Sequence, residues 1–263
     1  MTQKKKHYFV GIDAGSRTTK AVLLDDEGNL VSAIRPTGIN VGATAEEVFG
    51  DVLGQVDATP RDVKYLVGTG YGRVSLEFAD TTVTELSCHA LGANFINPEI
   101  RMVIDIGGQD SKVIQLDENG SMVDFIMNDK CAAGTGKFLE MVARKLETDL
   151  ENLSDIHFES EQPCAINSMC VVFVETEIIS LLARGESAAN IVSGVNWAFA
   201  NRIGNMARRL GIKEQYVLTG GVAKNRGLKD ALNQYLGVPF APLGIDPQIN
   251  GALGAAVLAL RSS

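Results

Sequence analysis

The chain has 263 residues, 45% of them hydrophobic and 21% charged, with a formal net charge of −8. At about 150 residues per domain, this length predicts one large domain or two modest ones, with a core that needs no disulfide support. The acidic balance argues against a nucleic-acid partner, which requires a basic surface. No apolar run approaches the roughly 18 residues of a membrane helix and no signal peptide precedes Tyr8, so we expect a soluble, cytoplasmic protein that binds no membrane.

The first 56 residues of the sequence predict three short strands followed by a helix. An apolar run from Tyr8 to Ile12 predicts a strand, and a second run from Ala21 to Leu24 predicts a strand that returns after a polar turn. A turn from Asp25 to Gly28 precedes a third strand that starts at Leu30. Helical periodicity from Ala45 to Val56 completes the unit.

The same unit returns at a constant offset of 92 residues. The matched pairs include Asp13 with Asp105, Gly15 with Gly107, Lys20 with Lys112 and Leu24 with Leu116. The second copy predicts strands over Met102–Ile106, over Val113–Leu116 and from Met122, followed by a helix over Thr135–Leu146. Such self-similarity implies two similar lobes, which we assign to residues 1–95 plus 245–263 and to residues 96–244.

The turn after the first strand of each copy carries residue types that bind phosphate. Backbone N–H groups of glycine turns and the hydroxyls and ammonium groups beside them donate to phosphate oxygens. The candidates are Gly15, Ser16, Thr18, Thr19 and Lys20 in the first copy, and Gly107, Gly108 and Gln109 in the second. Asp13 and Asp105, at the strand ends, are candidates for holding a hydrated Mg²⁺. The alternative is a pair of ordinary hairpins, and the repetition favours phosphate binding.

A third glycine motif follows an apolar strand at Tyr216–Thr219 and precedes a predicted helix start. A glycine pair lets a ring or a phosphate approach the backbone closely, so this motif suits the nucleoside end of a nucleotide. The candidate contacts to adenosine or ribose are Gly220, Gly221, Val222 and Asn225, with Gln248 on the far side of the pocket. Gln109 is a candidate for orienting the attacking water, and the alternative for it is a plain turn residue.

These three motifs together resemble the actin, sugar-kinase and Hsp70 ATPase superfamily. The resemblance implies an α/β fold of two duplicated ribonuclease H-like lobes with a nucleotide cleft between them. The stretch Asn250–Ala256 is similar to the closing helix of that superfamily, which packs on the first lobe. Two other functions of this fold are a small-molecule kinase without a metal cluster and a nucleotide-dependent scaffold without hydrolysis.

We expect the four cysteines of this chain to be reduced thiols, metal ligands or catalytic groups. Cys131 and Cys170 each precede a predicted helix, whose N-terminus favours a thiolate. The alternative for both is a small buried hydrophobic residue. We interpret Cys88 and Cys164 as structural.

Two long stretches, Asn128–Gly136 and Cys170–Glu177, resemble the activator proteins of 2-hydroxyacyl-CoA dehydratases. Related members are the ATPase subunits of benzoyl-CoA reductase and the reductases of double-cubane-cluster proteins. The resemblance implies a homodimer in which Cys131 and Cys170 of each chain hold one shared 4Fe–4S cluster. It also implies ATP hydrolysis with Mg²⁺, a ferredoxin or flavodoxin as electron donor, and an iron–sulfur enzyme as acceptor. Valines at 171, 172 and 174 depart from the Thr and Ala common in that family, without affecting the ligand.

Overall fold

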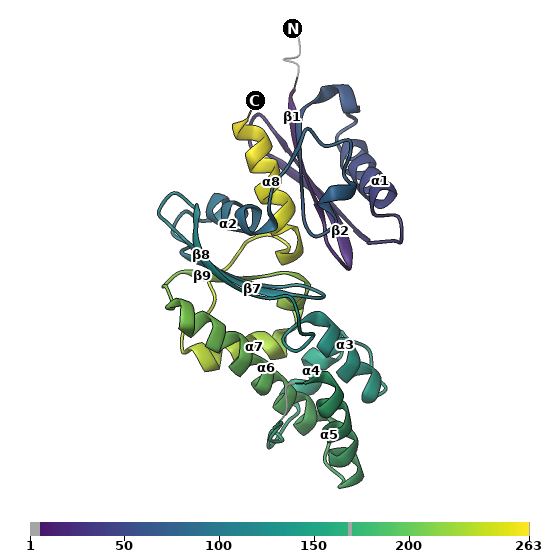
Figure 1. Cartoon of the computed structure of the whole chain (residues 1–263), viewed down its shortest axis with the longest axis vertical. Coiled ribbons are helices and arrows are strands. Elements are labelled where there is room, and N and C mark those ends of the chain that lie inside the picture. Colours follow the sequence, from purple (N-terminus) through teal and green to yellow (C-terminus); the bar gives the residue numbers. More distant parts are fainter. Residues whose placement is uncertain (1–5, 168–169, 263) are drawn as a thin grey trace. The chain divides into compact units, whose positions relative to one another are not determined.

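The computed structural model describes residues 6–167 and 170–262, so Lys4, Lys5, Ser168 and Met169 lie outside the described residues. The chain divides into two compact units. Unit 1 comprises Met1–Val103, Gln115–Val123 and Leu243–Ser263, and unit 2 comprises Ile104–Ile114 and Asp124–Pro242. Each unit has its own set of helices (Figure 1).

The first sheet has five strands in the order β3-β2-β1-β4-β5. Their bounds are β1 Tyr8–Ala14, β2 Thr18–Asp25, β3 Leu30–Pro36, β4 Val63–Thr69 and β5 Thr81–Thr82. Strand β1 is antiparallel to β2 and parallel to β4, and β2 is antiparallel to β3. This order confirms the predicted three-strand meander.

Helices cover both faces of this sheet because its central strands are apolar on both sides. Val10 and Ile12 of β1 pack in one buried cluster with residues of α1 (Val41–Gly54). Val22 and Leu24 of β2 pack in another cluster with residues of α8 (Asn250–Arg261). Helix α8 also contacts α2 (Glu85–Ile96), as Figure 1 shows. The predicted closing helix is therefore confirmed, and it packs within unit 1.

The second sheet has the order β8-β7-β6-β9. The bounds are β6 Met102–Ile106, β7 Ser111–Leu116, β8 Met122–Asn128 and β9 Tyr216–Thr219. Both copies form the same turn after their second strand, because an aspartate oxygen accepts from two backbone N–H groups in each. Asp25 accepts from Glu27 and Asn29, and Asp117 accepts from Asn119 and Ser121. The repeat seen in the sequence is thus a repeat of backbone structure.

The remaining helices belong to unit 2. They are α3 Gly136–Lys145, α4 Leu153–Phe158, α5 Val171–Ala183, α6 Ala188–Leu210 and α7 Arg226–Leu236. The long helix α6 contacts α4 and α7, and its Phe199 ring lies 6.1 Å from that of Phe138 on α3. Short 3-10 turns occupy Pro60–Asp62, Arg73–Ser75, Gly221–Lys224 and Pro247–Ile249. Among the helices formed by residues 6–167 and 170–262, none combines the length and apolar character needed to cross a membrane.

Candidate functional site

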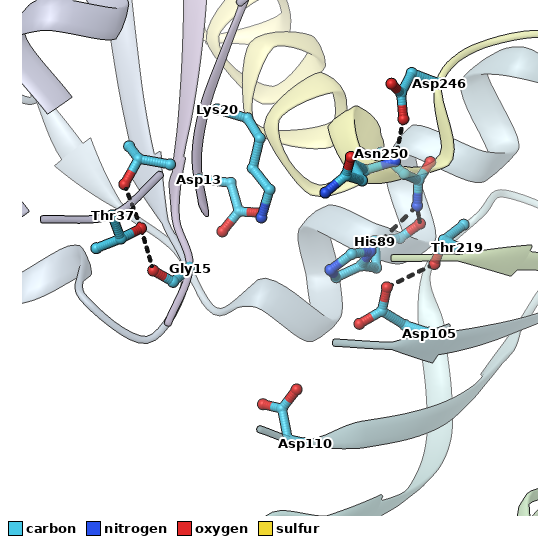
Figure 2. A network of polar contacts seen from close by, with 12 residues as sticks. Asp13, Gly15, Lys20, Thr37, His89, Asp105, Asp110, Thr219, Asp246 and Asn250 are labelled. Carbon is cyan, nitrogen blue, oxygen red and sulfur yellow. Dashed lines mark hydrogen bonds and ion pairs between the residues drawn. The ribbon is translucent and has the colours of Figure 1, made fainter. Parts of the chain in front are cut away.

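The β1–β2 turn in unit 1 is held from one side by backbone and hydroxyl donors. The turn is closed by a bond from the Gly15 N–H to the Thr18 carbonyl, 3.1 Å long. Thr37 donates through its hydroxyl to the Gly15 carbonyl at 2.8 Å and through its N–H to the Arg17 carbonyl at 2.9 Å (Figure 2). Because the C=O and the following N–H of a trans peptide point in opposite directions, the N–H groups of Ser16 and Thr18 point away from Thr37.

The β6–β7 turn in unit 2 is built in the same way. The Gly107 N–H donates to the Asp110 carbonyl at 2.9 Å, at an offset of 92 from the Gly15 bond. The carbonyls of Gly107 and Gly108 accept from the N–H groups of Gly136 and Lys137, both at 2.9 Å. These two donors belong to the first turn of α3, whose N–H groups have no partner within the helix. The N–H groups of Gly108 and Gln109 therefore point away from α3, and the Gln109 side chain is exposed.

Each turn is flanked by a buried aspartate that is paired with a lysine. Lys20 Nζ lies 3.0 Å from Asp13 Oδ2, and the strand register places these two residues opposite each other. In the second copy, Lys112 Nζ lies 3.3 Å from Asp105 Oδ2 and 2.8 Å from Asp110 Oδ1. Asp13, Asp105 and Lys112 are each at most 5% exposed. Both copies thus keep a carboxylate and an ammonium group together at the end of the first strand.

A threonine–glycine pair at the end of the neighbouring strand lies beside each aspartate. Thr219 Oγ1 donates to Asp105 Oδ1 at 2.7 Å (Figure 2), and Gly220 follows with φ +84°. In unit 1, Thr69 is the register partner of Asp13, and Gly70 follows with φ +92°. A Cβ at position 70 would lie 2.4 Å from Asp13 Oδ1, so the left-handed backbone and the close approach both require glycine. Sequence reasoning singled out Gly220 but missed the matching pair Thr69–Gly70, although Thr-Gly ends an apolar run at both places.

Some predicted contacts serve the scaffold in this structure. Thr19 is fully buried, and its hydroxyl lies 2.9 Å from that of Thr37, so it supports the first turn from within. The Gln248 N–H donates to Asp246 Oδ1 at 2.9 Å in the turn before α8. Asn250, the first residue of α8, donates from Nδ2 to the His89 carbonyl at 2.9 Å and ties α8 to α2 (Figure 2).

The predicted nucleoside motif has one polar group that no protein atom satisfies. A 3-10 turn begins at Gly221, the second glycine of the pair, and α7 begins only at Arg226 because Asn225 caps it. Asn225 Oδ1 accepts from the Leu228 N–H at 2.9 Å. In the described part of the chain, Asn225 Nδ2 is buried and has no acceptor. A buried donor without a partner is costly, so this amide suits a ligand oxygen or nitrogen.

The cysteines differ in exposure, and none of the four is in a disulfide. Cys170 is exposed and is the N-cap residue of α5, as predicted, and Cys131 is half-buried in the segment between β8 and α3. Cys88 is fully buried, and burial raises its pKa to about 12. Burial and the nearby Glu186 raise the pKa of Cys164 as well. Within residues 6–167 and 170–262 of the single chain, no group of three or more His, Cys, Asp or Glu side chains is arranged to bind a metal ion.

Known proteins resemble this chain in both sequence and structure. Residues 10–259 match the model of the BadF/BadG/BcrA/BcrD ATPase family. The chain is 44% identical over 260 residues to the (R)-2-hydroxyglutaryl-CoA dehydratase activating ATPase of Acidaminococcus fermentans, covering 97% of this chain and 98% of that protein.

Two solved structures are similar to the whole chain. The crystal structure of component A of the A. fermentans (R)-2-hydroxyglutaryl-CoA dehydratase superposes with a TM-score of 0.92 at 43% identity, covering 97% of this chain and 98% of that one. The activator of the 2-hydroxyisocaproyl-CoA dehydratase from Clostridium difficile with bound ADPNP superposes with a TM-score of 0.90 at 40% identity, covering 97% and 95%. These similarities confirm the predicted α/β fold of the actin-like ATPases.

Proposed function

This chain belongs to the BadF/BadG/BcrA/BcrD ATPase family, and we propose that it hydrolyses ATP to drive one-electron transfer to an iron–sulfur enzyme of the 2-hydroxyacyl-CoA dehydratase type. The relatives named as dehydratase activators support this function. We further propose that a reduced ferredoxin or flavodoxin is the donor and that the active form is a homodimer with one 4Fe–4S cluster.

Phosphate binding is assigned to the two glycine turns. Their carbonyls are already bonded on one side, so the N–H groups of Ser16 and Thr18 in unit 1, and of Gly108 and Gln109 in unit 2, are oriented as donors on the other. Oriented backbone N–H groups bind anions without reorganisation. The nucleoside end is assigned to the motif at Gly220–Asn225, where the Asn225 amide has an unused donor.

Asp13 and Asp105 are proposed to hold a hydrated Mg²⁺, which prefers carboxylate and water oxygens. Each carboxylate is kept in place when no metal is bound, because a lysine lies 3.0 to 3.3 Å away. Lys20 and Lys112 then become available to phosphate oxygens when the metal takes over the carboxylates. Gln109, which is exposed on its turn, is proposed to orient the attacking water.

The residues proposed as cluster ligands are Cys131 and Cys170. A 4Fe–4S cluster takes four thiolates and supplies a one-electron couple when bound. Cys170 fits this role because it is exposed at the N-terminus of a 13-residue helix. Since one chain offers two such thiols, a two-fold homodimer completes the set.

The observation that carries the proposal is the pair of backbone hydrogen bonds between the β6–β7 turn and α3. The turn assigned to phosphate accepts hydrogen bonds from the helix that directly follows the Cys131 segment. ATP binding and the ligand segment are thereby joined within unit 2.

The test is anaerobic purification of the wild-type protein and of Cys131→Ala, Cys170→Ala and Cys164→Ala variants. The wild-type protein is expected to be brown, to contain about four irons per dimer, and to hydrolyse ATP with Mg²⁺. Cys131→Ala and Cys170→Ala should lose the iron, while the control Cys164→Ala keeps it. Full iron content in the Cys170 variant would remove the ligand assignment, and a wild-type protein that neither binds iron nor hydrolyses ATP would overturn the function.

A further inference from the structure

The segment that carries Cys131 has three consecutive carbonyls held by side chains or a turn. Asn128 Nδ2 donates to the carbonyls of Cys131 and Ala133, both at 2.9 Å. Thr135 donates to the Ala132 carbonyl through its N–H at 3.1 Å and its hydroxyl at 2.7 Å. One carboxamide on the last residue of β8 thus fixes the backbone on both sides of Ala132.

Asn128 is itself held from α6. Arg202 Nη2 donates to Asn128 Oδ1 at 3.1 Å, and this bond fixes which way the carboxamide faces. The alkyl part of Arg202 lies beneath Gly134, where an added Cβ would be 3.2 Å from Arg202 Cδ. Helix α6 is largely buried along one side, so it is a rigid base for this contact.

The clamped carbonyls decide where the neighbouring N–H groups point. Because the Cys131 and Ala133 carbonyls face Asn128, the N–H groups of Ala132 and Gly134 face away from it. Backbone N–H groups next to a ligating cysteine are the usual donors to cluster sulfur, and such bonds raise the reduction potential. Rotation of this segment would therefore change both the thiol position and these donors.

Resting on the proposed function, we propose that Asn128 is a positioning residue for the Cys131 thiolate, and that Arg202 sets the orientation of Asn128. Asn128 has no assigned contact with nucleotide or with iron. It acts through the backbone of residues 131–133, as the outer groups that orient a metal ligand do in other metal sites.

The experiment compares Asn128→Ala and Arg202→Gln with the matched control Asn119→Ala. Asn119 is exposed in the turn that precedes β8, so its substitution removes the same kind of carboxamide at a site away from the Cys131 segment. In iron-free protein, the alkylation rates of Cys131 and Cys170 by iodoacetamide are measured by mass spectrometry. In the iron-loaded dimer, the rate of iron loss to a chelator and the midpoint potential are measured.

Loss of two hydrogen bonds should speed Cys131 alkylation by about tenfold in Asn128→Ala, with Cys170 unchanged. The loaded variant should release iron about tenfold faster and have a lower midpoint potential. Arg202→Gln should change each quantity in the same direction by a smaller factor, and it carries the test if Asn128→Ala does not fold. Asn119→Ala should match the wild-type protein.

Cys131 alkylation rates within twofold of wild type, together with an unchanged midpoint potential, in both variants would overturn the positioning role, whatever the function. A wild-type protein that takes up no iron would instead overturn the proposed function. The alkylation rate of Cys131 in iron-free protein tests the positioning role of Asn128 independently of whether iron binds.

Discussion

Burial separates the cysteines into accessible and inaccessible thiols. Cys88 is fully buried under the α2–α8 contact, and burial raises its pKa to about 12 despite a hydrogen bond with Thr69 that lowers it. Cys170 is exposed at the start of α5. The thiolate is the reactive form, so access and pKa both protect Cys88 from modification.

Cys88 should therefore react with iodoacetamide at pH 8 about a thousandfold more slowly than an unperturbed thiol, because its thiolate fraction falls by that factor. Cys170 in the same iron-free sample is the internal reference and should react fast. The raised pKa also makes the free energy of unfolding decrease as pH rises above the ordinary thiol value of 9.0. Rapid labelling of Cys88 in folded protein would contradict its burial in the α2–α8 contact.

The identity of the polar residues at the turns was predictable, but their pairing was not. The repeat at offset 92 indicates that Asp13, Lys20 and their counterparts are functional residues. Whether the lysine lies opposite the aspartate depends on the strand register, which the repeat does not report. Thr19 was predicted to contact phosphate together with Thr18. The alternation of side chains along β2 places the Thr19 hydroxyl in a buried contact with Thr37, which the sequence did not predict.

Among the elements, α2 and α8 approach each other so closely that their contact has no room for side chains. A Cβ at Gly254 of α8 would lie 1.7 Å from the Cys88 carbonyl oxygen of α2. A Cβ at Gly92 of α2 would lie 2.3 Å from the Asn250 carbonyl oxygen of α8. Because the opposing atoms belong to the backbone, the contact cannot relax by a rotamer change.

Gly254→Ala should lower the stability of unit 1 by about 3 kcal/mol, at the upper end of the usual cost of overpacking. The control is Gly50→Ala on α1, where nothing lies within 4 Å of the added Cβ. This second change should instead add about 0.5–1 kcal/mol, because alanine is the better helix former. Chemical denaturation of both variants measures the difference. A Gly254→Ala protein as stable as Gly50→Ala would show that the helices separate at little cost.

Element types were predictable from periodicity, whereas their bounds depend on caps. The helix predicted from Ala45 begins at Val41, because Asn40 Oδ1 accepts from the Ala43 N–H. The helix predicted directly after the Gly220–Gly221 pair begins at Arg226, because Asn225 caps it. Each cap is a single asparagine whose effect depends on local backbone angles, which hydrophobic periodicity does not report.

At the scale of the whole molecule, the route from the turn proposed to bind phosphate to the proposed cluster ligand Cys131 is short and lies within unit 2. The β6–β7 turn accepts two hydrogen bonds from α3, and the segment before α3 carries Cys131. Asn128 and Arg202 connect the same segment to α6. Under the proposed function, a shift of this turn on phosphate binding would reach the Cys131 backbone through these bonds.

We predict that a chelator removes iron from the loaded protein at clearly different rates in the ADP-bound and ADPNP-bound states. If the nucleotide also changes the reduction potential of the cluster, linkage requires that the redox state changes the affinity for ATP by the same free energy. A tenfold difference in chelation rate corresponds to about 1.4 kcal/mol in the activation free energy of iron loss.

Gln109→Ala provides the discriminating variant for this coupling. Gln109 is assigned to the attacking water, so its loss should slow hydrolysis and preserve the difference in chelation rates, because the carbonyls of Gly107 and Gly108 still bond to α3. Hydrogen–deuterium exchange of residues 128–137 in the two nucleotide states should change in parallel with chelation. Equal chelation rates and equal exchange in both states would mean that nucleotide binding does not reach Cys131 through this helix.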